Sequence, residues 1–71
     1  MKLICRDDEI FVNADAIVQV WRRFADITFV FTDGSQYQTV CENKEEARRV
    51  MGEIKQFLSK ENGQQNVLTL P

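Results

Sequence analysis

The spacing of the apolar residues changes once along the chain, near residue 43, and this change limits the folds open to it. Before that point apolar and polar residues alternate, most clearly in residues 26–32 (DITFVFT), as they do in strands that bury one face. After it, apolar residues recur at the 3.6-residue spacing of an amphipathic helix, at Ala47, Val50, Met51, Ile54, Phe57 and Leu58. The sequence therefore predicts a series of strands followed by one helix.

Signals at both ends support this helix. Asn43 is a suitable N-cap, and Glu46 stands three residues later, at the spacing of a capping box. Glu45 and Arg49 have the i, i+4 spacing of a favourable ion pair. We expect the helix to end by residues 62–63, where a glycine can take the left-handed C-cap conformation. Gly52 either allows close approach to the sheet or is tolerated on the solvent side, and we favour the second interpretation.

The strands are predicted from the segments that precede the helix. Residues 2–6 and 9–12 favour β-structure on either side of the charged break at residues 6–8, so we expect a hairpin. The sequence Asn-Ala-Asp at 13–15 indicates a bend or a single helical turn over 13–16, and a strand should follow from about 17 to 23.

The hairpin around Gly34 has two candidate registers. A two-residue turn on Asp33-Gly34 would place Phe29 opposite Gln38, which mixes core and solvent residues. A three-residue loop over 32–34, with Gly34 left-handed in a bulge, places Phe29 opposite Tyr37 and keeps apolar residues together. It also places Ile27 opposite Thr39. We therefore predict the bulged loop.

These elements predict an α+β fold, in which an antiparallel four-stranded β-meander carries one C-terminal amphipathic helix packed on one face, as a two-layer sandwich. With 71 residues and 8.3 kDa, the chain has room for one domain, which we assign to residues 1–62. Residues 63–71 form a C-terminal tail or arm. Their aliphatic end is compatible with a disordered tail, a short edge strand, or an arm that docks on this or a neighbouring subunit.

One helix cannot cover a four-stranded sheet, because a helix is about 10 Å wide and strands lie about 4.8 Å apart. The face of the sheet away from the helix should therefore be left to water or to a partner. The alternation predicts that this face carries Thr28, Val30, Thr32, Gln36, Gln38 and Val40.

The composition argues against most enzyme chemistry. The chain has no His, which removes Ser-His-Asp and Cys-His arrangements, and its three glycines are isolated, so no phosphate-binding loop is predicted. Cys5 and Cys41 lie far apart in apolar runs, as expected of buried, reduced thiols. We therefore predict a protein that is not an enzyme, with no catalytic, cofactor-binding or metal-binding residues and no small-molecule substrate.

Charge and hydropathy bear on partners and location. The net charge is −2 and the pI is about 5.0, so no global positive field attracts nucleic acid or anionic lipid. No stretch approaches the roughly 20 apolar residues of a membrane span. The first residues lack the long apolar region of a secretory signal. These features predict a soluble, cytoplasmic protein with no membrane partner.

The segment Trp21-Arg22-Arg23-Phe24 is the main candidate for binding. Strand alternation places Trp21 and Arg23 on one face and Arg22 and Phe24 on the other. We predict a small protein–protein interaction or regulatory module that meets a protein partner or self-associates as a homodimer. Its candidate interaction residues are Trp21, Arg22, Arg23, Val30, Tyr37, Leu68 and Leu70. The alternative is a single-stranded nucleic-acid-binding domain that uses the sheet with Arg22 and Arg23.

Residues 9–17 (EIFVNADAI), a following strand, residues 27–34 (ITFVFTDG), Tyr37 and a terminal helix together resemble the small bacterial flagellar FlbD-type family. That family shares an apolar strand, then Asn, a small residue or Pro, an acidic residue, any residue and Ile, and later an aromatic residue three positions after a turn glycine. Here the segment after Tyr37 is one residue longer, and residues 67–71 have no counterpart. The resemblance implies a bacterial, cytoplasmic, non-enzymatic accessory or regulatory protein and transfers no binding residue.

Overall fold

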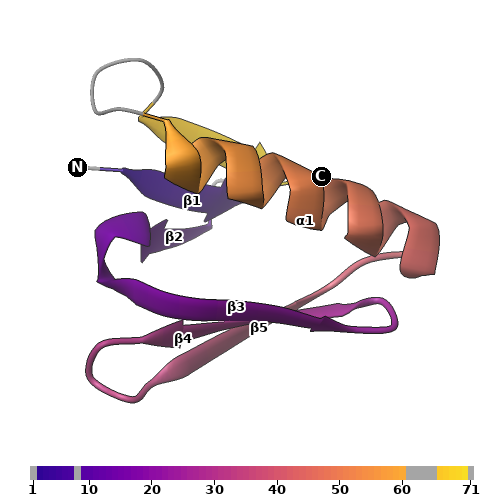
Figure 1. Ribbon diagram of the computed structural model, residues 1–71, viewed down its shortest axis with the longest axis horizontal. Helices are drawn as coiled ribbons and strands as arrows, with labels where there is room; N and C mark the ends of the chain where they lie inside the picture. The colour runs from indigo at the N-terminus through magenta and orange to yellow at the C-terminus, as the bar shows by residue number, and fades with distance from the viewer. Residues whose placement is uncertain (1, 8, 61–65, 71) are drawn as a thin grey trace.

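The computed structural model describes residues 2–7, 9–60 and 66–70. In these ranges the chain forms six strands, one 3₁₀ turn and one α-helix. Figure 1 shows their arrangement. In chain order they are β1 (Leu3–Arg6), β2 (Ile10–Asn13), η1 (Ala14–Ala16), β3 (Ile17–Arg23), β4 (Asp26–Phe31), β5 (Gln36–Val40), α1 (Lys44–Ser59) and β6 (Val67–Leu70).

The strands form two sheets of three strands each, in the orders β2-β1-β6 and β3-β4-β5. The prediction of a single four-stranded meander is therefore wrong, although the α+β class is confirmed. The chain passes from the first sheet to the second at η1, where the Asn13 side chain accepts a hydrogen bond from the Asp15 N–H (3.0 Å) and starts the turn that separates β2 from β3. The prediction of a turn at 13–16 is itself confirmed.

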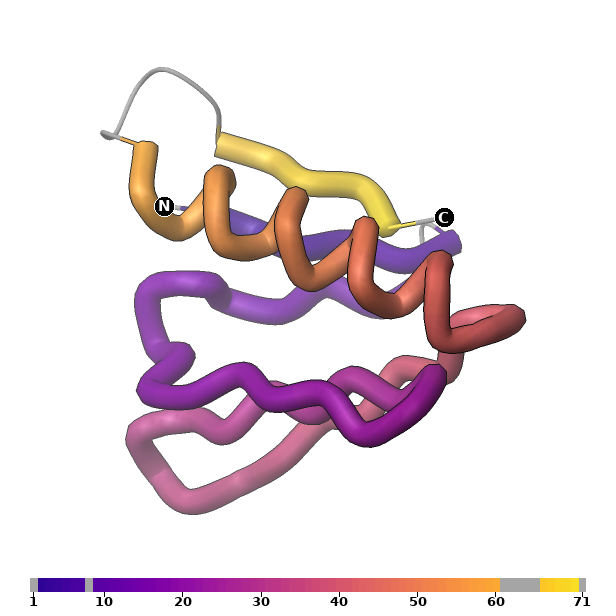
Figure 2. The backbone as a smooth tube through the Cα atoms, turned by 45° about the vertical axis from the view of Figure 1, so that its right-hand side comes forward, coloured from indigo at the N-terminus to yellow at the C-terminus, as the bar shows by residue number. Residues whose placement is uncertain are grey.

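The helix packs against both sheets. It contacts β3 and β4 of one sheet and β6 of the other, and Figure 2 shows it running alongside both of them. The core between these three layers consists mainly of aliphatic side chains around two phenylalanines, Phe29 and Phe57, which are almost completely buried. Phe29 stacks on the half-buried Tyr37, with ring centroids 6.0 Å apart. Two facing sheets and a helix bury more apolar surface than one helix on one sheet could.

The β4–β5 hairpin has the predicted register. Phe29 lies opposite Tyr37 and Ile27 opposite Thr39. The Phe31 N–H bonds to the Ser35 carbonyl (2.9 Å), which leaves residues 32–34 as the loop, and Gly34 has the left-handed φ of 87°. The Ser35 hydroxyl and N–H both donate to Asp33 Oδ1, at 2.6 and 2.9 Å, and these bonds lower the pKa of the Asp33 carboxyl.

The helix begins as predicted. Asn43 Oδ1 accepts a hydrogen bond from the Glu46 N–H (2.8 Å), and the Glu46 carboxylate accepts one from the Glu42 N–H (3.1 Å). Arg49 pairs with Glu46 at 4.0 Å rather than with the predicted partner Glu45. A Cβ added at Gly52 would meet no atom within 4 Å, so the prediction that Gly52 is tolerated rather than required for close approach is confirmed.

Strand β6 decides among the alternatives for the C-terminal segment, as far as the structure describes it. Residues 63–65 and 71 lie outside the described residues. Residues 67–70 pair in parallel with β1 of the same molecule, with Leu68 opposite Ile4 and Leu70 opposite Arg6. Leu70 is 5% exposed, and Leu68 packs against the core. This segment is therefore an edge strand of the first sheet.

Two basic side chains connect the layers. Lys2 is 5% exposed, and its ammonium donates hydrogen bonds to the carbonyl oxygens of Phe57 (3.0 Å) and Lys60 at the end of α1. The ammonium also lies 5.4 Å from the centre of the Phe57 ring. Arg6, at the end of β1, donates to the Thr39 hydroxyl of the other sheet. Neither role was predicted from the sequence.

Candidate protein-interaction site

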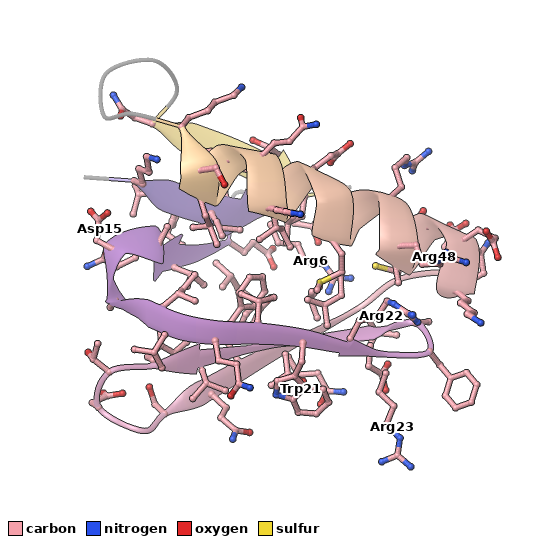
Figure 3. The ribbon with its side chains drawn as sticks, viewed as in Figure 1. Arg6, Asp15, Trp21, Arg22, Arg23 and Arg48 are labelled. Carbon is pink, nitrogen blue, oxygen red and sulfur yellow. The ribbon has the colours of Figure 1, made fainter. Side chains whose placement is uncertain are left out.

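The sheet β3-β4-β5 has one face directed away from the core, which we call the outer face. The strand registers place on it Gln19, Trp21, Arg23, Asp26, Thr28, Val30, Gln36, Gln38 and Val40. Figure 3 shows Trp21 and Arg23 pointing away from α1 and from the other sheet. No element in the described part of the chain covers this face. The predicted bare face is thus present, except that Thr32 lies in the turn that follows β4.

Trp21 is the largest side chain of the outer face. It is 41% exposed, and it lies directly opposite Thr28, which is only 4% exposed although no other layer covers it. The neighbouring side chains of the face itself therefore shield Thr28. Val40, at 57% exposed, adds an aliphatic surface near the end of β5. A partly exposed Trp beside small and aliphatic residues is typical of surfaces that bind proteins.

The charges of the outer face are few and of opposite sign. Arg23 and Asp26 are cross-strand partners at one end of β3 and β4. The remaining residues of the outer face are neutral. A face with so little net charge does not attract the phosphate backbone of nucleic acid strongly.

The other members of the Trp21–Phe24 segment lie elsewhere. Arg22 is opposite the core residue Ile27, on the helix side of the sheet, and its guanidinium donates to the Phe24 carbonyl (3.0 Å). Phe24 forms the tip of the β3–β4 hairpin, with a left-handed φ of 53° and 73% of its surface exposed. The predicted separation of Trp21 and Arg23 from Arg22 is confirmed.

Three further predicted interaction residues do not join Trp21. Tyr37 lies on the core side of the sheet against Phe29, because the register places it there. Leu68 and Leu70 contribute to the core through β6, in the other sheet. Of the predicted set, the outer face therefore contains Trp21, Arg23 and Val30.

A groove that the sequence did not predict lies between α1 and β3. It has a volume of about 500 Å³ and is lined mainly by aliphatic side chains from the two elements. Its β3 wall includes Ile17, Val18 and Val20, and its helix wall includes Met51, Ile54 and Leu58. Val18 is 62% exposed, so apolar surface is accessible here. The alternation of residues 17–20 does not indicate which other element faces them.

The two thiols are not joined in the structure. Cys5 is buried and Cys41 is half-buried. Desolvation raises the pKa of the Cys41 thiol, and the nearby Glu46 carboxylate raises it further. Cys41 is therefore protonated at neutral pH and is a poor nucleophile.

The described residues contain neither a metal-binding cluster nor a membrane-spanning helix. No group of three Cys, Asp or Glu side chains in that part of the chain is placed to hold a metal ion. Within the same ranges, no helix has both the length and the apolar character needed to cross a membrane. The chain matches no protein-family model, no curated protein and no solved structure with which it was compared.

Proposed function

We propose that this protein is a small, non-enzymatic protein–protein interaction module that self-associates through the outer face. The observation that carries the proposal is the partly exposed Trp21 on a sheet face that no described element covers. The two unjoined thiols suit a reducing compartment such as the cytoplasm.

The geometry favours a two-fold dimer. In a symmetric dimer the same patch on each subunit meets its copy, so a patch of low net charge avoids repulsion between like charges. The outer face is such a patch, since Arg23 and Asp26 offset each other at one end. The core of a domain of this size supplies only a few kcal/mol of stability. Burial of Trp21 and Val40 against a second copy would add to that stability.

Replacing Trp21 by Ala is expected to weaken dimerisation roughly 1,000-fold, because a two-fold dimer loses two aromatic hot-spot residues at about 2 kcal/mol each. Sedimentation equilibrium from 1 μM to about 100 μM measures the monomer–dimer constant. Phe24→Asn is the matched control, because Phe24 is an exposed aromatic outside the outer face and Asn accepts its left-handed backbone. A strictly monomeric wild type at tens of micromolar, or equal weakening by both variants, would contradict the proposal.

The second candidate is single-stranded nucleic-acid binding, and it is favoured by one observation, the presence of Trp21 and Arg23 on the same exposed face. Arg22 and Tyr37 do not support it, because they lie on the core side. We expect no binding of a fluorescent oligothymidine at 50 mM salt. Binding that weakened linearly with salt on a log–log plot, and that Trp21→Ala abolished, would favour this candidate instead.

A further inference from the structure

We infer that the groove between α1 and β3 binds an extended, acidic segment of a partner protein, which pairs with the free edge of β3 as an additional strand. This site lies on the helix side of the sheet and shares with the outer face only Gln19, at the irregularity in β3. The inference rests on three observations: the backbone edge of β3, the apolar walls of the groove, and the basic side chains along it.

The edge of β3 has backbone groups directed toward the groove side. β3 is at one end of the order β3-β4-β5, so one strand only is paired with it in the described part of the chain. The Phe31 N–H bonds to Ser35, which shows that odd-numbered residues of β4 bond to β5 and even-numbered ones to β3. The register then leaves the backbone N–H and C=O groups of Val20 and Arg22 directed away from β4, on the unpaired edge of β3. An extended peptide uses such groups when it adds to a sheet.

The walls of the groove suit apolar side chains that alternate along such a peptide. The volume of about 500 Å³ lies within the range of ligand-binding clefts. Val18 and Leu58 are exposed on opposite walls, at 62% and 37%. Gly52 contributes no side chain to the helix wall, and the space beside it is open. The groove can therefore take side chains without displacing existing ones.

The charge on the lining of the groove is positive. Lys55 lines it, and the lining contains no acidic residue. Arg48 lies seven residues before Lys55, on the same face of the helix. Neither of these cations forms an ion pair within the described ranges. Figure 3 shows Arg22 on the helix side of β3, toward the end of the molecule at which Arg48 lies. The chain as a whole carries −2, so this positive rim is a local feature.

These charges select the occupant. A second copy that paired its β3 edge here would bring another groove lined by Lys55 and by no acidic residue, so it offers no opposite charge to Lys55. In an added strand every second side chain faces the groove. A segment that carries both apolar and acidic residues at those groove-facing positions complements the aliphatic walls and Lys55 together. We therefore assign the groove to a partner segment of that chemistry rather than to a second copy.

A synthetic ten-residue peptide with Ser at every second position, and with Val and Glu in turn at the positions between, tests the assignment by fluorescence anisotropy against the full chain. We expect it to bind at least ten-fold more tightly than the same peptide with Lys in place of Glu. N-methylation of every second backbone nitrogen blocks one edge of the peptide. One methylated set should therefore abolish binding and the complementary set should retain it. Failure of the acidic peptide to bind, or equal binding of the acidic and basic peptides, would overturn the inference.

Variants of the protein locate the site. Gly52→Leu places a side chain in the open space of the groove and improves helix propensity, so the fold is retained and peptide affinity should fall at least ten-fold. Gln56→Leu is the matched control, since Gln56 is exposed on the same helix but does not line the groove. Lys55→Glu should reverse the preference toward the Lys peptide.

The outer face provides a separate control. Trp21→Ala should leave peptide binding unchanged, so failure of the dimer proposal and failure of this inference can be told apart. Unchanged peptide affinity in Gly52→Leu, or a loss of affinity in Trp21→Ala, would place the peptide outside the groove and overturn the inference.

Discussion

Replacing Leu70 by Ala is expected to lower the free energy of unfolding by about 2–5 kcal/mol, the usual cost of truncating a buried leucine. Leu70 is 5% exposed and belongs to the main core cluster through β6. A domain of 71 residues has a total stability of roughly 4–11 kcal/mol. The variant should therefore lose a large share of its stability, and urea denaturation followed by circular dichroism measures the loss.

Thr69→Ala is the control for Leu70→Ala, because Thr69 is the adjacent residue of β6 and its side chain is exposed. We expect its free energy of unfolding to stay within about 0.5 kcal/mol of wild type. Removal of residues 66–71 should be more damaging than Leu70→Ala, since it also exposes the edge of β1. A truncated protein with an unchanged urea midpoint would show that β6 does not contribute to the folded state.

Replacing Lys2 by Met is expected to destabilise the protein by about 1.5–3 kcal/mol, the range for hydrogen bonds to charged groups. Methionine keeps most of the apolar stem but removes the ammonium that bonds to the carbonyls of Phe57 and Lys60. Those carbonyls lie at the C-terminal end of α1, where the helix dipole also favours a positive charge. The loss should appear as a lower denaturation midpoint with an unchanged m-value.

Lys55→Met is the matched control for Lys2→Met, because it makes the same chemical change at an exposed position of α1. Its free energy of unfolding should change by less than about 0.5 kcal/mol. Equal effects of the two substitutions would mean that Lys2 acts only through general charge and not as a cap of the helix.

The parts of the fold that depend on neighbouring residues were predictable. The period of residues 26–32 gave β4, and the 3.6-residue spacing after residue 43 gave α1 with its cap at Asn43. The bulged β4–β5 loop was also predictable, because only that register pairs Phe29 with Tyr37. In each case the hydrophobic pattern and the turn chemistry point to the same structure.

The division into two sheets was not predictable from local pattern. Residues 67–70 pair with β1, more than sixty positions earlier, and no local signal distinguishes a parallel edge strand from an apolar tail. The burial of Lys2 is a second feature that local sequence pattern does not predict. A lysine near the start of a chain is ordinarily a solvated surface residue, and its burial here depends on where α1 ends.

For the candidate site, strand alternation correctly predicted which face of the sheet the side chains at the end of β3 occupy. Alternation placed Trp21 and Arg23 on one face and Arg22 on the other, as the structure does. The register that sets Tyr37 opposite Phe29 also implies that Tyr37 faces the core, so the prediction of Tyr37 as an interaction residue conflicts with the predicted register itself. The groove between α1 and β3 depends on how these two elements are placed relative to each other. The spacing of apolar residues within either element does not predict that placement.

The parallel pairing of β1 with β6 bears on when the protein can fold during its synthesis. β1 is the middle strand of its sheet, yet one of its two neighbours is made about sixty residues later. The β3-β4-β5 sheet, in contrast, is joined by short hairpins and needs no later segment for its strands to pair. On the ribosome the strands of the hairpin sheet can therefore pair early, while β1 keeps an unpaired edge until residue 70 has emerged.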